Sequence, residues 1–171
     1  MSILPFDGIE PELHPDVFVA GNAIVIGRVK IDRNASIWFG SVVRADSNDV
    51  HIGKNTNLQD CVVVHTSAEF PCRIGEGVVA GHNAVIHACT IGDNCLIGIG
   101  SIVLNGADIG EGSIVAAGSV VTPGKKFPPR AFIMGIPGRH VRDVTDEEYN
   151  TTKTLAGKYV NLAQQYKSST G

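Results

Sequence analysis

Three histidines in the middle of this chain carry side chains of the kind that bind transition metals: His65, His82 and His87. Neutral imidazole is a common ligand of zinc, and three protein ligands leave a fourth tetrahedral position open for water. Whether the three converge on one ion depends on the elements that position them. The remaining histidines have no partner in this scheme and are expected to be ordinary surface or core residues: His14, His51 and His140.

A six-residue repeat positions these histidines. Aliphatic residues return every six positions, in four runs: Val19, Val25, Ile31, Ile37 and Val43; Ile52, Leu58 and Val64; Ile74, Ala80 and Ile86; and Ile91, Ile97, Val103, Ile109, Val115 and Val121. A small or β-branched residue usually stands two positions earlier, and glycine often follows. Hexapeptide periods of this kind predict a parallel β-helix, in which each turn buries its apolar residues against the next turn. The expected fold is therefore mainly β.

The interruptions of the repeat decide which outward residues share a face. Residues are added after Val43 and after Val64, and one residue is lost after Ile86. All three irregularities fall at the same corner, so these three residues stack one above another. Side chains on a strand alternate between its two faces, and the next residue in each case points outward. Those next residues are Arg44, His65 and His87, which should form one column with a spacing of about 4.8 Å.

His82 lies elsewhere on this prism. It stands two residues after Ala80, at the corner beyond the first face, and should point away from the column that holds His65 and His87. A site that uses all three histidines then needs a second chain to supply His82 across an interface. Rotation about a three-fold axis closes such a contact without leaving open ends. The sequence thus predicts a homotrimer with three metal sites between subunits.

The composition excludes several classes of partner. The net charge is −3 over 171 residues and charged residues make up only 18%, which argues against nucleic acid and against an anionic membrane surface. No apolar run is long enough to span a bilayer, and no basic segment followed by an apolar core starts the chain. The four cysteines include no C-x-x-C pair, and Cys89 and Cys95 stand where other repeats have Ala or Ser. We expect a cytoplasmic protein without disulfides.

The chain is expected to contain four segments: a lead-in over 1–16, the coil over 17–122, a non-helical crossing segment over 123–144 that is rich in Pro and Gly, and a helix over 145–168. Thr145 and Glu148 predict a capping box at the start of the helix. An apolar stripe follows and should pack along the coil; its members are Tyr149, Thr152, Ala156, Tyr159, Ala163 and Tyr166. Tyr159 either only covers the coil or also contributes to the site.

Several of these segments resemble the γ-class carbonic anhydrase family: Arg44-Ala45-Asp46, Asn57-Leu58-Gln59-Asp60, His65, and Gly81-His82-Asn83-Ala84-Val85-Ile86-His87. The resemblance spans nearly the whole chain. It implies a left-handed β-helix trimer that holds one zinc or ferrous ion at each subunit interface, with His65 and His87 from one chain and His82 from the next. The implied activity is the reversible hydration of CO2 to bicarbonate. In such a reaction a metal lowers the pKa of bound water, an effect of which a carbonic anhydrase is itself the standard example.

The resemblance also implies roles for other residues. Gln59 would orient the reactive hydroxide, with Asn57 beside it. Arg44 would hold the bicarbonate, and its predicted place in the histidine column puts a cation where a carboxylate-like group could bind. Asp46 and Asp60 would pair with Arg44 or lie at the interface, where a salt bridge that locks the subunits together explains them equally well.

One departure from the family pattern concerns proton release. Active members carry a long acidic loop, whereas the stretch after His65 is short and contains a single carboxylate, Glu69. Glu69 is either a proton relay or a solvated surface residue. Two alternatives stay open: a coenzyme A thioesterase or acyltransferase, and a catalytically silent metal-binding structural trimer. Acyltransferases of this fold typically use one histidine and no metal, so three converging histidines argue against them.

Overall fold

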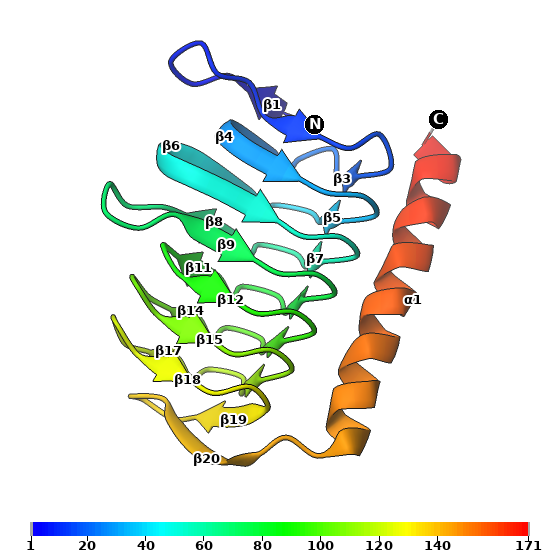
Figure 1. Ribbon diagram of the computed structural model, residues 1–171. Helices are drawn as coiled ribbons and strands as arrows, with labels where there is room; N and C mark the ends of the chain where they lie inside the picture. Colours follow the sequence, from blue (N-terminus) through cyan, green and yellow to red (C-terminus); the bar gives the residue numbers. More distant parts are fainter. Residues whose placement is uncertain (1, 171) are drawn as a thin grey trace.

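The computed structural model describes residues 2–170 and shows a coil of short parallel strands with one long helix lying along it (Figure 1). Within the coil, each strand pairs in parallel with the strands of the adjacent turns. The strands wind through about seven turns. The parallel β-helix that the six-residue repeat predicts is therefore confirmed.

Face one of the coil is a single sheet of seven parallel strands, closed by one antiparallel strand at its end. Its strands are β3 (Phe18–Val19), β5 (Ser36–Ile37), β7 (Asn57–Leu58), β10 (Val79–Ala80), β13 (Leu96–Ile97), β16 (Ile114–Val115), β19 (Ala131–Met134) and the antiparallel β20 (Arg139–Asp143).

Faces two and three belong to a second sheet, because two long strands run through both of them: β4 (Ile24–Ile31) and β6 (Val42–Ile52). Face two continues with β8 (Val63–His65), β11 (Val85–His87), β14 (Ile102–Val103) and β17 (Val120–Val121). Face three contains β2 (Glu12–Leu13), β9 (Cys72–Ile74), β12 (Thr90–Ile91), β15 (Asp108–Ile109) and β18 (Lys126–Phe127). The first strand, β1 (Ser2–Leu4), pairs with the start of β4.

The core is the inside of the prism. From Val25 to Val121, every aliphatic residue of the repeat is buried, and the small residues two positions earlier are buried beside them. Hydroxyl groups among these small residues bond to the next turn: Ser41 Oγ donates to the carbonyl oxygen of Gln59 at 2.7 Å, and Thr56 Oγ1 donates to that of Gly75 at 2.7 Å. Stacking of turns thus stabilises both the apolar interior and the corners.

The coil extends further than the repeat indicates. Beyond residue 122, β18 pairs with β15 and β19 pairs with β16, both in parallel. Phe127 and Ile133 occupy the inward positions there, with Ile133 fully buried, but the prolines and lysines around them hide the six-residue pattern. At the other end, β1 and β2 pair in parallel with β4. Parts of the expected lead-in and crossing segments are therefore joined to the coil.

The helix α1 (Asp146–Thr170) starts at the predicted capping box. The backbone N–H of Thr145 donates to Glu148 Oε2 at 3.0 Å, and the backbone N–H of Glu148 donates to Thr145 Oγ1 at 3.2 Å. The helix then runs back along face one to the first turns (Figure 1). Its own residues Thr152, Ala156 and Ala163 are buried on the side that packs against the coil.

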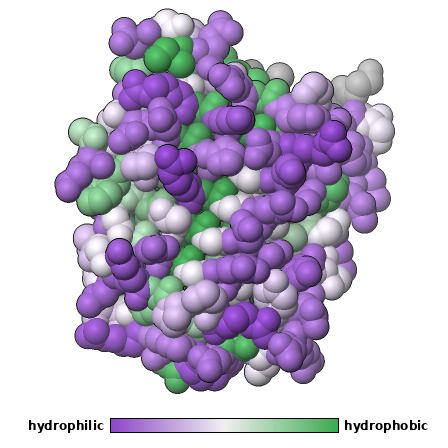
Figure 2. Space-filling model, in the orientation of Figure 1, coloured by the Kyte–Doolittle hydropathy of each residue, from purple (hydrophilic) through white to green (hydrophobic). Residues whose placement is uncertain are grey.

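The outer surface of this side of the molecule is mostly hydrophilic, with hydrophobic residues in a broken central band and in small spots elsewhere (Figure 2). Within residues 2–170, no helix combines the length and apolar character needed to cross a membrane.

Candidate metal centre

Face two places three of the predicted residues in one column. Arg44, the third residue of β6, is paired in register with His65, and His65 with His87, and the two histidines end β8 and β11. Their inward neighbours are the fully buried Val43, Val64 and Ile86, as the residue count predicts. The column exists because the irregular lengths of these turns all fall at the corner that follows face two.

The two imidazoles of this column face each other. Nδ1 of His65 lies 3.0 Å from Nε2 of His87, while His65 Nε2 lies 2.9 Å from Asp46 Oδ1 and His87 Nδ1 lies 2.7 Å from Asn105 Oδ1. The carboxylate and amide oxygens accept only, so each neutral ring donates its single N–H to them. With both rings neutral, each facing nitrogen then carries a lone pair, and the 3.0 Å contact needs a proton or a metal ion between them.

This arrangement fits a transition metal ion. Two bare ring nitrogens at 3.0 Å repel each other unless a cation lies against both. Tetrahedral zinc with Zn–N bonds near 2.0–2.1 Å holds its ligand nitrogens about 3.3 Å apart. Metal-binding histidines commonly donate their other ring N–H to a carboxylate or a carbonyl oxygen, as both rings do here.

Asp46 connects the column to Arg44. The Arg44 guanidinium pairs with Asp46 Oδ2, while Asp46 Oδ1 accepts from His65. Burial by itself raises the pKa of Asp46, but the hydrogen bonds from His65 and Arg44 outweigh burial and bring this pKa to about 2. Asp46 therefore stays ionised at all ordinary pH values and orients two residues of the column at once.

His82 lies at the corner that follows β10, where its Nδ1 is 2.8 Å from Asp60 Oδ2. About two-fifths of each side chain is exposed. Backbone hydrogen bonds hold the corner between its neighbours, since Asn83 N–H donates to the Asp60 carbonyl oxygen and Gly100 N–H donates to that of His82. Asp60 thus leaves the other ring nitrogen of His82 free for a ligand.

Gln59, Asn57 and Tyr159 lie around the same corner. Gln59 Nε2 donates to Asn57 Oδ1 at 3.4 Å, and both side chains are buried. Within the described residues, Asn57 Nδ2 is buried without a hydrogen-bond partner. Tyr159 of α1 stacks edge-on against Trp38, with 5.5 Å between ring centroids. Burial raises the pKa of Tyr159, and the negative charge of Asp60 raises it further.

The predicted site residues thus form two separate groups in one chain. The column half-site consists of Arg44, Asp46, His65, His87 and Asn105. The corner half-site consists of Asn57, Gln59, Asp60, His82 and Tyr159. Over residues 2–170, no three metal-binding side chains meet within the chain, so His82 does not join His65 and His87 there.

Glu69 lies in the short loop after His65. Ser67 N–H donates to the Phe70 carbonyl oxygen at 3.1 Å, and Asn48 N–H donates to Thr66 Oγ1 at 3.2 Å. The loop is therefore anchored to the coil while the Glu69 side chain is exposed. The three histidines left out of the scheme each contact an aspartate on other parts of the surface: His14 with Asp16, His51 with Asp32, and His140 with Asp143.

Asn105 is the one member of the column half-site that the sequence did not reveal. It follows Leu104, which lies in the turn after His87, and it precedes Gly106 at the corner. The turn between Ile86 and Val103 contains 17 residues instead of 18, because Ile86 pairs with Val103. The count of that turn aligns Leu104 with His87 and puts Asn105 one position further on, so it does not reveal that the Asn105 side chain reaches the ring.

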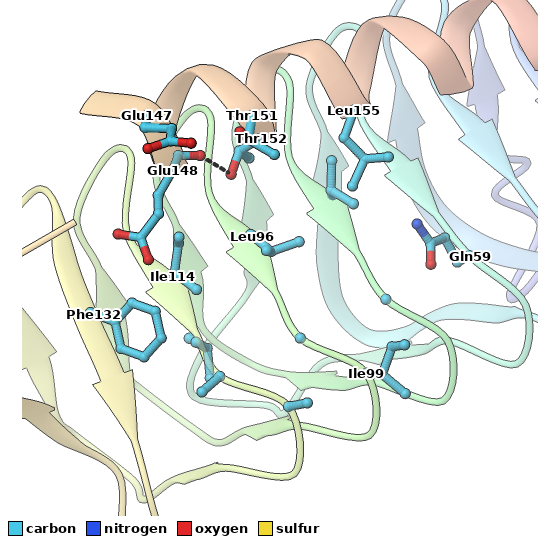
Figure 3. A pocket seen from close by; sticks show the side chains of 16 residues that line it. Gln59, Leu96, Ile99, Ile114, Phe132, Glu147, Glu148, Thr151, Thr152 and Leu155 are labelled. Atoms are coloured by element: carbon cyan, nitrogen blue, oxygen red, sulfur yellow. Dashed lines mark hydrogen bonds between the residues drawn. The ribbon is translucent and has the colours of Figure 1, made fainter. Parts of the chain in front are cut away.

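A groove of about 560 Å³ runs between α1 and face one and begins at Gln59 (Figure 3). Its walls are mostly apolar, with Leu96, Ile114 and Leu155 along its length, and Glu148 and Phe132 stand at the far end. The corner half-site therefore borders an apolar channel on the side of the helix.

Comparisons with known proteins concern the repeat and the chain as a whole. The family model "Bacterial transferase hexapeptide (six repeats)" matches residues 88–123. A protein of Methanocaldococcus jannaschii named probable carbonic anhydrase is 46% identical over 153 residues, which cover 90% of this chain and 96% of that protein. Gamma carbonic anhydrase 2, mitochondrial, of Arabidopsis thaliana is 40% identical over 164 residues, covering 92% of this chain and 59% of that protein.

Among solved structures, a putative acetyltransferase of Bacillus cereus superposes with a TM-score of 0.96 at 36% identity, covering 98% of this chain and 97% of that one. The whole coil and its helix are thus shared with a protein described as an acetyltransferase. The Methanocaldococcus jannaschii protein, which matches over nearly its whole length, is instead named a probable carbonic anhydrase.

Proposed function

Because this chain belongs to the γ-class carbonic anhydrase family of hexapeptide-repeat proteins, we propose that it catalyses the reversible hydration of CO2 to bicarbonate as a metal-dependent homotrimer. The observation that carries this proposal is the facing pair of ring nitrogens on His65 and His87, 3.0 Å apart, with the other nitrogen of each ring against an oxygen of Asp46 or Asn105. A partly buried pair of this kind has no use in acyl transfer, which needs one imidazole as a base.

The proposed metal ligands are His65 and His87 of one chain and His82 of the next. Zinc or ferrous iron suits this set, because imidazole binds both ions and three ligands leave a coordination position open. When bound, the ion would act as a Lewis acid that lowers the pKa of a water molecule in that open position. Each proposed ligand already has an oxygen on its second ring nitrogen: Asp46, Asp60 or Asn105.

An apolar stripe on face two supports the trimer. Six aliphatic side chains point outward there, one per turn, in register beside the histidine column. This apolar stripe consists of Ile24, Val42, Val63, Val85, Ile102 and Val120. The corner half-site has its own apolar neighbour, since Ile99 beside His82 is 56% exposed. A second copy that brings corner to column would bury both surfaces and complete the metal site.

Gln59 and Asn57 suit the task of orienting the reacting water. Gln59 uses its Nε2–H to donate to Asn57, which leaves its own side-chain oxygen free to accept a hydrogen bond. The water must direct a lone pair at the carbon of CO2, and an acceptor for its proton sets that direction. The side-chain amide of Asn57 adds a donor next to this acceptor, since among the described residues its buried Nδ2 has no partner.

Arg44 suits the task of holding the anionic product. Its guanidinium lies next to His65 in the column and is held by Asp46. A planar cation with several N–H donors matches the geometry of a carboxylate-like anion such as bicarbonate.

We also propose a cytoplasmic location, because all four cysteines are unpaired thiols.

The proposal is tested with two variants that each damage a different half-site, His87→Ala and His82→Ala. Each alone should lose CO2 hydration, measured by stopped-flow with zinc or ferrous iron supplied. Subunits of the two variants, mixed during refolding or by co-expression, should regain about one quarter of the wild-type activity, since random trimers pair an intact column with an intact corner at that frequency. A mixture of the two variants without CO2 hydration activity would refute the shared metal site. A metal-loaded wild-type protein without CO2 hydration activity would refute the proposed anhydrase function.

A further inference from the structure

Asn105 contacts the proposed ligand His87, but the sequence alone assigned Asn105 no role. We propose that Asn105 is a positioning residue of the metal centre, whose side-chain oxygen holds His87 in the Nδ1-protonated form and leaves Nε2 for the ion. The inference rests on the proposed metal site. It concerns a residue that touches neither the metal nor the substrate.

The chemistry of the contact decides the form of the ring. Oδ1 of Asn105 lies 2.7 Å from Nδ1 of His87, the shortest of the oxygen contacts made by the three proposed ligands. An amide oxygen is an acceptor, so the ring nitrogen must donate. In a neutral imidazole the second nitrogen then carries the lone pair, and that nitrogen is the one that faces His65.

The backbone holds Asn105 against the same frame as the ligands. Ala88 N–H donates to the His65 carbonyl oxygen at 2.8 Å, and Gly106 N–H donates to that of Ala88 at 2.7 Å. On the other side, Gly124 N–H donates to the Asn105 carbonyl oxygen at 2.8 Å. The residue after His87 and the residue after Asn105 are therefore directly bonded, which fixes the distance between the two side chains.

The anchored loop adds a second support. Gly106 has a φ of +65°, and the ring of Phe70 lies only 3.2 Å from where a Cβ on Gly106 would be. Phe70 thus packs on the backbone next to Asn105 and covers this corner. Positioning shells of this kind work because their own members cannot move.

His87 has an amide as its hydrogen-bond acceptor, whereas His65 and His82 have carboxylates. An uncharged acceptor suits a site that must bind an anionic product. Asp46 and Asp60 already place two negative charges around the proposed dication. A third carboxylate would further lower the positive potential that attracts bicarbonate. Asn105 supplies the same hydrogen bond without that charge.

The test compares Asn105→Leu, which removes the acceptor, with Asn105→Asp, which keeps the acceptor and shape but adds a charge. Zinc affinity of the full-length protein is measured by competition with a chromophoric chelator. Asn105→Leu should bind zinc about 10- to 100-fold more weakly, and Asn105→Asp should bind it at least as tightly as wild type. The aspartate variant should also show a raised KM for bicarbonate at unchanged metal occupancy.

Equal zinc affinity in wild type and Asn105→Leu would overturn the inference, and so would an aspartate variant as weak as the leucine variant. A measurement on the metal-free protein distinguishes failure of this inference from failure of the proposed function. In ¹⁵N spectra of the metal-free protein, His87 should carry its proton on Nδ1 in wild type and lose this preference in Asn105→Leu. A preference that survives in the leucine variant overturns the inference even if the wild type binds no zinc.

Discussion

His82 and Asp60 meet at an open corner of the coil, with Nδ1 of the histidine 2.8 Å from Oδ2 of the aspartate. Neither side chain enters the core, and the corner is held by backbone hydrogen bonds that do not involve the two side chains. The contact orients the His82 imidazole. Among the described residues of a single chain, however, His82 does not join two other metal-binding side chains around one ion.

His82→Ala should therefore remove the metal but not the fold. An exposed pair of this kind contributes little, so the free energy of unfolding should fall by less than about 1 kcal/mol. Elemental analysis of the purified variant should show loss of bound metal, with the circular dichroism spectrum unchanged. His51→Ala is the matched control, because His51 makes a similar exposed contact with Asp32 at 2.9 Å on face three. Full metal occupancy in His82→Ala would remove this residue from the site.

Val63→Lys should disperse the proposed trimer. Val63 is 38% exposed in the middle of the apolar stripe, and burying an unpaired ammonium group at an interface is costly. Analytical ultracentrifugation should show monomers with an intact coil and no bound metal. Thr90→Lys places the same charge at an exposed position on face three and should leave the trimer whole. A trimeric Val63→Lys protein would exclude face two from the interface.

Glu148 should make stability depend on pH in the acid range. The hydrogen bond from Arg142, and then that from the Thr145 backbone N–H, lower the pKa of Glu148 from 4.5 to about 2. Because the folded-state pKa is depressed, this stabilisation is fully present above about pH 4.5 and is lost as the pH falls toward 2. Glu148→Gln should be less stable than wild type at pH 7, and the difference should shrink across that range.

Urea unfolding at a series of pH values checks this, with Glu147→Gln as control because that carboxylate makes neither hydrogen bond. A difference between wild type and Glu148→Gln that stays constant down to pH 2 would contradict the assignment.

Turnover should rise with the concentration of an added imidazole-type buffer. The loop after His65 carries one carboxylate, Glu69, whose side chain is exposed on an anchored loop. With so few groups to pass a proton outward, an external base should accept it. Stopped-flow rates over a range of buffer concentrations at constant pH and ionic strength test this. A rate independent of buffer would indicate an internal relay, and Glu69→Ala would then show whether Glu69 provides it.

The register of the histidine column could be predicted because the repeat has only two orientations for each residue. Once Val43, Val64 and Ile86 are inward, Arg44, His65 and His87 must be outward and aligned, and the structure pairs them so. The corner position of His82 follows from the same count.

The contacts between side chains of different turns could not be predicted in the same way. Asn105 reaches His87 diagonally, one position beyond its aligned partner, and such a contact depends on rotamers and on a turn shortened by one residue. The last turns were missed for another reason. Phe127 and Ile133 point inward, yet the prolines, glycine and lysines around them break the pattern by which the other turns are found.

The path of α1 has a consequence for how the molecule folds and unfolds. In a solenoid each turn contacts only its neighbours, so turns could be lost one at a time from either end. Here the last residues of the helix contact the first turns: Lys167 Nζ donates to the Pro15 carbonyl oxygen at 2.9 Å, and the rings of Tyr166 and Phe18 lie 5.7 Å apart. The helix thus links the two ends of the coil, and a stack of separable turns becomes one cooperative unit that is completed only when the final helical turn has been synthesised.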